Sequence, residues 1–185
     1  MLARLSWPTG DAGVRKIRRD LASGDALSGA EARTLPSVAA ARQRLIELSM
    51  GVRSCGSCSQ GCDGVEGRFS GGYCCSGPTA DVFRDEELDL LRGLGARPSQ
   101  YRGSGQGAGC SFRGPRGCVL GAEQRPSVCL AYACTALRRE IAESGLGREL
   151  GQAQDQLDAA MGDFRRARAA RLRRRDEAEV WDLPV

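Results

Sequence analysis

The sequence contains no histidine, and Lys16 is the only lysine among its 27 basic residues. Because imidazole is absent, histidine-based catalysis and histidine metal ligation are excluded, which leaves thiolates and carboxylates for such roles. Aromatic residues make up only 5% of the 185 residues, so we expect a modest apolar core. A small core usually needs an additional crosslink, such as a bound metal or a disulfide.

Long apolar runs are also missing. No stretch approaches the ~18 consecutive apolar residues of a membrane span, and Arg4, Pro8 and Gly10 interrupt the beginning of the chain, unlike the apolar region of a secretory signal. We therefore expect a cytoplasmic protein without membrane contact, whose cysteines stay reduced. A secreted form with a disulfide framework is the alternative, in which nine cysteines would leave one thiol unpaired.

Cysteine is the residue that the sequence concentrates. All nine cysteines lie between residues 55 and 134, in two groups. The first group comprises Cys55, Cys58, Cys62, Cys74 and Cys75, and the second comprises Cys110, Cys118, Cys129 and Cys134. Thiolates are soft ligands that select zinc, iron–sulfur clusters or copper(I), and a CxxC spacing occurs in both zinc and iron–sulfur sites. All nine cysteines are therefore candidate metal ligands.

The expected fold is mainly α: one small domain with irregular, glycine-rich metal-binding loops and a long C-terminal helix. Three segments are predicted, namely an N-terminal helical segment (1–51), a cysteine-cluster metal-binding region (52–144) and a basic amphipathic C-terminal helix (145–185). Glycine is too frequent between residues 51 and 77 for regular structure. It would let the chain turn tightly enough for neighbouring cysteines to reach one ion.

A first helix is expected to begin at Asp11, with Val14, Ile17 and Leu21 on its apolar face at spacings of three and four. Ser23 lies at its expected end.

A second helical region follows. Ser28 and Glu31 have the spacing of a capping box, but Pro36 is expected to interrupt the turn that they begin. A longer helix should begin directly after this proline, with Arg42 and Arg44 on its outer face.

Two further helices are predicted within the cysteine-bearing region. The acidic run at residues 85–87 should begin one of them, and its carboxylates favour a capping role over acid–base chemistry. The other is expected from Ser127 to about Ser144. Cys129 and Cys134 would not share a face of such a helix. They therefore bind different metals unless the first turn is distorted.

The last helix is expected after Gly147, with a narrow apolar stripe that includes Leu157 and Phe164. Seven arginines follow within residues 165–175. Charge on all sides of a helix cannot be buried, so we expect this part to project into solvent or onto an anionic partner. Nucleic acid is the less favoured partner, since few aromatic residues accompany the arginines.

The cysteine motifs resemble those of the YkgJ-type cysteine-cluster family, a zinc- or iron-chelating domain that is also found in flagellin lysine N-methylases. Cys55-x-x-Cys58 and Cys74-Cys75 match its first motif. The second motif is matched by Cys110, Cys118 and the segment from Arg125-Pro126 through Cys129 and Tyr132 to Cys134. The resemblance covers about residues 52–136. It implies eight ligands, with Arg125 donating to a sulfur or a carbonyl and Tyr132 packing over the site.

The chain departs from this family pattern within the first motif. Fifteen residues separate Cys58 from Cys74, and this insertion carries Cys62, which is either a spare thiol or a replacement ligand. The resemblance favours iron, bound as an iron–sulfur cluster, in redox chemistry or in support of a modification enzyme. The alternative is a zinc-stapled binding module whose basic C-terminal helix contacts nucleic acid or an acidic protein. No catalytic residue can be assigned, so whether the chain is an enzyme stays open.

Overall fold

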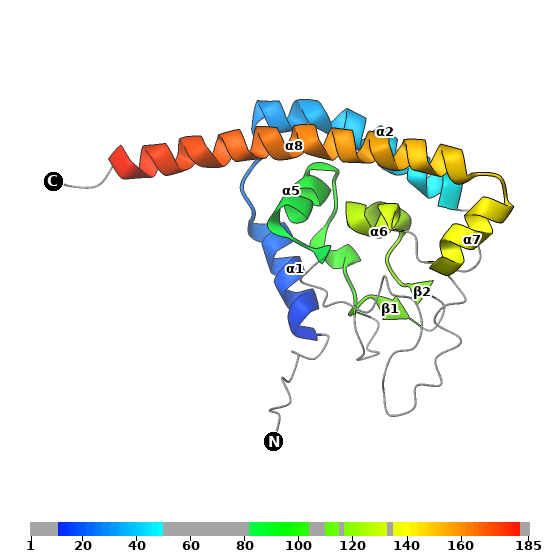
Figure 1. Ribbon diagram of the computed structural model, residues 1–185. Helices are drawn as coiled ribbons and strands as arrows, with labels where there is room; N and C mark the ends of the chain where they lie inside the picture. The colour runs from blue at the N-terminus through cyan, green and yellow to red at the C-terminus, as the bar shows by residue number, and fades with distance from the viewer. Residues whose placement is uncertain (1–10, 50–81, 104–109, 115–116, 133–134, 182–185) are drawn as a thin grey trace, which may run out of the picture.

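A computed structural model describes residues 11–49, 82–103, 110–114, 117–132 and 135–181. The fold is mainly α, as predicted (Figure 1). Its helices are α1 (Asp11–Ser23), α2 (Gly29–Ser49), α5 (Asp85–Gly93), α6 (Ser127–Ala131), α7 (Thr135–Glu143) and α8 (Gly147–Trp181). Two short 3₁₀ turns, η3 (Pro98–Gln100) and η4 (Ala122–Gln124), and a two-stranded antiparallel ladder of β1 (Arg113–Gly114) and β2 (Gly117–Cys118) complete it. No helix in these ranges is long and apolar enough to cross a membrane.

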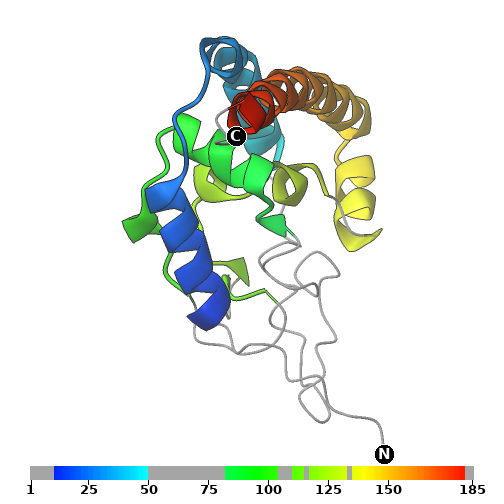
Figure 2. The same ribbon diagram turned by 90° about the vertical axis from the view of Figure 1, so that its left-hand side faces the viewer.

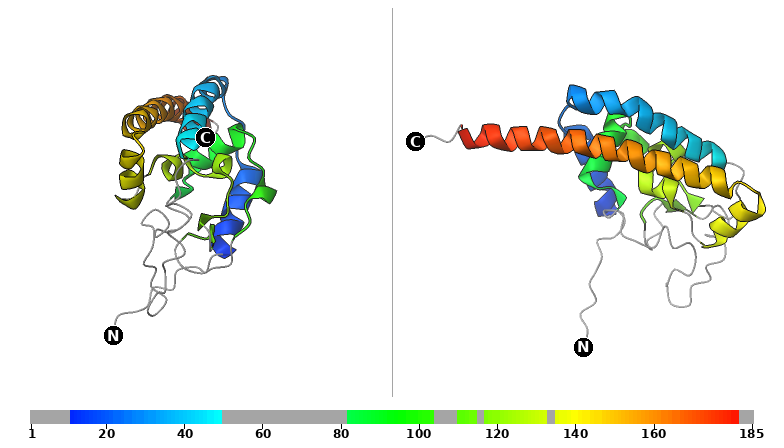
Figure 3. Two further views of the ribbon diagram at one scale, coloured as in Figure 1. Left: turned by 90° about the vertical axis from the view of Figure 1, so that its right-hand side faces the viewer. Right: turned by 45° about the horizontal axis from the view of Figure 1, so that its top comes forward.

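Helices α2 and α8 lie side by side and run in opposite directions along one side of the molecule (Figures 1 and 3). Their facing side chains form the larger apolar core, in which Leu45, Leu157 and Phe164 are 0–1% exposed. Leu90 of α5 and Leu130 of α6 complete this core from below. The predicted long C-terminal helix is therefore confirmed, and it packs on the N-terminal segment.

A second, smaller core lies between α1, α5 and the segments on either side of α5 (Figure 2). The predicted face of α1 supplies Val14, Ile17 and Leu21, and three aromatic rings fill the space opposite them. These rings are Phe83, Tyr101 and Phe112, whose centroids lie 5.3–6.0 Å apart. Edge-to-face and tilted pairs at these distances add stability beyond the apolar area that they bury. Helix α5 joins the two cores.

The beginning of α2 confirms one prediction and corrects another. The capping box forms as expected: the Ser28 backbone N–H donates to Glu31 Oε2 at 2.7 Å, and the Glu31 N–H donates to Ser28 Oγ at 3.3 Å. The predicted interruption at Pro36 is wrong, because α2 continues through it. An internal proline costs about 3 kcal/mol, but contacts with α8 hold the helix on both sides of it. Buried Glu31 binds Arg171 before the proline, and buried Val38 packs after it.

The single helix predicted over 127–144 is also wrong. Tyr132 has an extended conformation (φ −75°, ψ 124°), so α6 and α7 are separate helices. The carbonyl of Ala131 accepts a hydrogen bond from the Gln154 side chain of α8 at 2.5 Å. This contact satisfies a carbonyl at the end of α6 that a continuing helix would otherwise use. The first turn, where a distortion was considered, is helical, and the break in the predicted helix lies after it, at Tyr132.

Candidate metal centre

Three of the nine candidate ligands, Cys110, Cys118 and Cys129, lie in the described part of the chain, and each is partly exposed. Cys110 and Cys118 pack against the smaller core. Cys118 lies in β2, paired with Arg113, and the ladder is extended by a backbone bond from the Val119 N–H to the Phe112 carbonyl at 2.8 Å. Cys129 lies on α6.

The described residues do not by themselves bring together three or more metal-ligating side chains. The other predicted ligands, Cys55, Cys58, Cys62, Cys74, Cys75 and Cys134, lie outside the described residues. The donor set nevertheless fits a soft metal, because it consists of thiols and has no histidine. If the metal is bound, Cys110, Cys118 and Cys129 would be the ligands from the second cysteine group, together with Cys134.

Arg42 holds the segment that leads to Cys129. Its guanidinium donates to the carbonyl oxygens of Glu123 and Arg125 at 2.9 and 2.7 Å, and to Ser127 Oγ at 3.0 Å. These acceptors span η4 and the first residue of α6. We call residues 120–127 the anchored loop. Its last residue, Ser127, lies two positions before Cys129, so the loop leads directly to that cysteine.

Three other side chains fix the anchored loop. Glu87 of α5 accepts a hydrogen bond from the Ser127 backbone N–H at 3.0 Å and thereby caps α6. Tyr101 donates from its hydroxyl to the Gln124 carbonyl at 3.1 Å. Arg125 donates from Nε to the carbonyl of Leu120 at 3.2 Å, which is one of the two roles that the family resemblance implied for it.

Burial controls the electrostatics around this loop. It lowers the pKa of Arg42, an effect that the charge of Glu87 and the nearby Tyr101 and Cys129 oppose. Burial raises the pKa of Glu87, although the hydrogen bond from Ser127 and the charge of Arg42 act against this rise. It also raises the pKa of Tyr101 to about 12, so that its hydroxyl remains a donor at neutral pH.

Two sequence predictions are corrected here. Arg42 was expected on the outer face of its helix, but it is only 3% exposed, whereas Arg44 is on the surface as predicted. The acidic run 85–87 begins α5 as predicted, but its last residue, Glu87, is 5% exposed and caps α6 rather than its own helix. A sequence signal for Glu87 did exist. It precedes Leu91 by four residues and Leu94 by seven, which places it on the inward face of α5.

Large apolar side chains are exposed close to the described cysteines. Val119 is 49% exposed beside Cys118, and Val128 is 47% exposed beside Cys129. Tyr132 is 43% exposed. The packing of Tyr132 over a metal site therefore stays a prediction.

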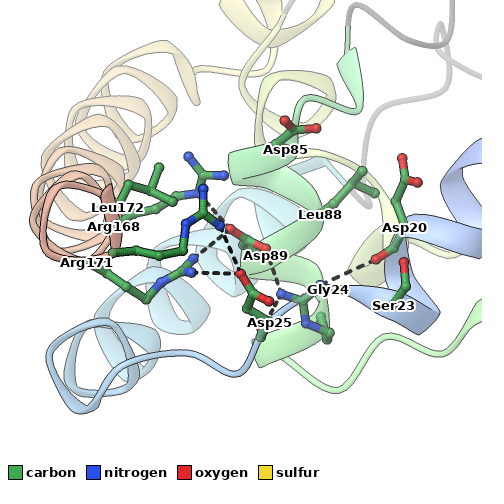
Figure 4. Close-up of a pocket in the computed structure, with 12 residues that line it drawn as sticks. Asp20, Ser23, Gly24, Asp25, Asp85, Leu88, Asp89, Arg168, Arg171 and Leu172 are labelled. Carbon is green, nitrogen blue, oxygen red and sulfur yellow. Dashed lines mark hydrogen bonds and ion pairs between the residues drawn. The ribbon is translucent and has the colours of Figure 1, made fainter. Parts of the chain in front are cut away.

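A second group of ionisable side chains joins α8 to α5 and to the beginning of α2 (Figure 4). Asp89 is its centre: one carboxylate oxygen lies 2.6 Å from Arg92, and the other lies 2.6 Å from Arg168 and 3.1 Å from Arg171. Arg171 also donates from Nε to Glu31 at 2.9 and 3.1 Å. Asp89 and the three arginines border a cavity of about 420 Å³ between α1, α5 and α8. We call Glu31, Asp89, Arg92, Arg168 and Arg171 the ionic cluster.

Glu31 is fully buried in this cluster. Burial raises its pKa, but hydrogen bonds from Ser28 and Arg171, together with the Arg171 charge, outweigh that effect and hold the pKa below its ordinary value. Glu31 therefore remains a carboxylate at neutral pH.

The prediction for the arginine-rich part of α8 was wrong in one respect. Arg168 and Arg171 do not project into solvent, since their side chains are only 18% and 14% exposed and bind acidic residues of the same chain. Arg173 and Arg174 are exposed, as expected. The charge available to an outside partner is accordingly smaller than the sequence indicated. Asp89 and Glu31 were not predicted as partners of these arginines because they lie 79 to 140 residues away in the sequence.

Comparisons with protein-family models, with curated proteins and with solved structures gave no match.

Proposed function

We propose that the chain is a cysteine-cluster metal-binding protein whose thiolates bind iron, in the form of an iron–sulfur cluster. The observation that carries the proposal is the concentration of nine cysteines in residues 55–134 of a chain without histidine. The motif resemblance to YkgJ-type proteins supports the same function. It also supports a redox role or a role beside a modification enzyme.

The described part of the fold is compatible with this assignment. Cys110, Cys118 and Cys129 are each partly exposed, and none of them belongs to the fully buried part of either apolar core. Reactive cysteines are found in such partly exposed positions, whereas buried structural cysteines are inert. We further propose a reducing, cytoplasmic location, because thiols persist there as potential ligands.

The metal content of anaerobically purified protein, measured together with its visible absorption spectrum, tests this proposal. Iron, acid-labile sulfide and a coloured protein are expected for an iron–sulfur cluster. Zinc in a colourless protein would support the alternative of a zinc-stapled binding module. Stoichiometric disulfides without any metal in freshly prepared protein would overturn both.

Loss of the metal should also affect the fold. Structural zinc sites contribute about 10–16 kcal/mol of apparent binding energy in small peptides, and a whole domain is stable by only about 5–15 kcal/mol. Cys→Ser substitution at Cys55, Cys58, Cys129 or Cys134 should therefore make the cysteine-bearing region sensitive to protease. Unchanged melting and protease resistance after complete metal removal would contradict this role.

A further inference from the structure

We propose that Arg42 is a positioning residue for the metal site: from helix α2, it fixes the backbone of the anchored loop that presents Cys129. The inference rests on the proposed function and extends it to the N-terminal segment, which lies outside the region of family resemblance. Helix α2 would then help to hold the metal site in place.

The hydrogen-bond pattern of Arg42 carries this inference. One guanidinium reaches two carbonyl oxygens and one hydroxyl, on Glu123, Arg125 and Ser127, at 2.7–3.0 Å. The rigid fork of an arginine can hold three such acceptors in fixed relative positions, which a lysine ammonium cannot do in the same way. The three acceptors belong to every second residue of the chain, and the last of them lies two residues before Cys129. Arg42 thus sets the course of the backbone directly before a predicted ligand.

The charge of Arg42 points to the same role. A buried cation is costly unless charged or polar groups compensate it, and Arg42 is 3% exposed. Its hydrogen bonds within the described part of the chain go to neutral oxygens, and the carboxylate of Glu87 binds the same loop at Ser127. A site of several thiolates around a divalent ion carries net negative charge, so a buried cation beside Cys129 would stabilise the loaded state.

A purely structural role for Arg42 predicts a different result from a positioning role, and a Glu31 variant serves to distinguish the two roles. Glu31 is also a buried charged residue of α2, but it belongs to the ionic cluster and binds Arg171 rather than the anchored loop. Substituting it should reduce stability without changing the surroundings of Cys129. Arg44 provides the matched arginine control, because its side chain is 49% exposed on the same helix.

The test measures Zn²⁺ affinity of the full chain, prepared metal-free under anaerobic, reducing conditions, by competition with a chromophoric chelator. Visible spectra after loading with Co²⁺ report the ligand geometry. Arg42→Lys should bind Zn²⁺ about 10–100-fold more weakly, the usual effect of losing a group that orients a metal ligand, and should alter the Co²⁺ spectrum. Arg44→Lys should match the wild type, and Glu31→Gln should melt earlier while its Zn²⁺ affinity stays within about threefold.

Each outcome decides a different point. A wild-type chain that binds neither Zn²⁺ nor Co²⁺ nor iron through its thiols would overturn the proposed function, and this inference with it. Equal affinity and spectra for Arg42→Lys and Arg44→Lys would overturn the inference alone, as would equal losses of affinity in Arg42→Lys and Glu31→Gln. If Arg42→Lys does not fold, Ser127→Ala removes one of the three hydrogen bonds, and unchanged Zn²⁺ affinity in that variant would count against the proposal.

Discussion

Removal of the Asp89 carboxylate should destabilise the protein far more than removal of an acidic residue on the surface. Asp89→Ala deletes the shared acceptor of Arg92, Arg168 and Arg171. The side chain of Asp89 is 12% exposed and those of the three arginines are 14–19% exposed, so solvent can replace the lost contacts only in part. The arginines would then be left as like charges close to one another.

The size of the effect follows from this burial. Removing one partner of a buried ion pair costs about 3–5 kcal/mol, and Glu31, which still binds Arg171, should limit the loss to about 3 kcal/mol. Urea unfolding is the assay. With a slope of about 2–3 kcal/mol/M, the midpoint should fall by about 1–1.5 M. Because the cluster is largely shielded from solvent, 1 M salt should reduce this difference only in part.

Asp163→Ala is the matched control. Asp163 also pairs with an arginine of α8, Arg166, but the two side chains are 62% and 74% exposed. Such surface pairs contribute about 0–1 kcal/mol, so the midpoint of this variant should scarcely move. If Asp89→Ala shifted the midpoint no more than Asp163→Ala does, the ionic cluster would not be what holds α8 on α5.

Three other changes have defined expectations. Pro36→Ala should stabilise the protein by about 2 kcal/mol, because the residue is exposed and alanine restores a hydrogen bond inside α2; a lower melting temperature would contradict this. Glu31 has a lowered pKa, so its contribution is present above about pH 4.3 and is lost as the pH falls through the folded value. Glu31→Gln should therefore flatten the acid limb of the stability–pH curve, and a parallel acid limb would refute the assignment. Cys62→Ser should keep the full metal content and remove the most readily alkylated thiol, whereas loss of one metal equivalent would make Cys62 a ligand.

Local sequence patterns predicted the helices α1 and α8 and the residues that these helices turn towards a core. The apolar spacing of α1 and the capping box of Ser28 and Glu31 appear in the structure as predicted. The stripe of α8 is also confirmed, since Leu157 and Phe164 are buried against α2. Such features depend on neighbours within a few residues, so a periodicity of 3.6 is sufficient to find them.

Features that depend on distant partners could not be predicted in this way. Arg42 and Arg44 lie equally far, about 80°, from the centre of the apolar face of α2 on a helical wheel. Arg42 is the buried one of the two because the anchored loop packs on its side of α2. The continuation of α2 through Pro36 has the same origin, because contacts with α8 outweigh a local preference. Of the predicted metal ligands, the described structure locates three, and their convergence on one ion stays a prediction.

The pairing of α2 with α8 has a consequence for the order in which the chain folds during synthesis. The apolar face of α2 is made early, but its partner residues on α8, such as Phe164, follow more than 100 residues later. At about 5–20 residues per second, that delay is on the order of 10 s on the ribosome. All nine cysteines emerge within this interval, before the larger core can close. The proposed ligands are therefore all synthesised while α2 still lacks its partner, so a metal that they bind could be taken up before the fold is complete.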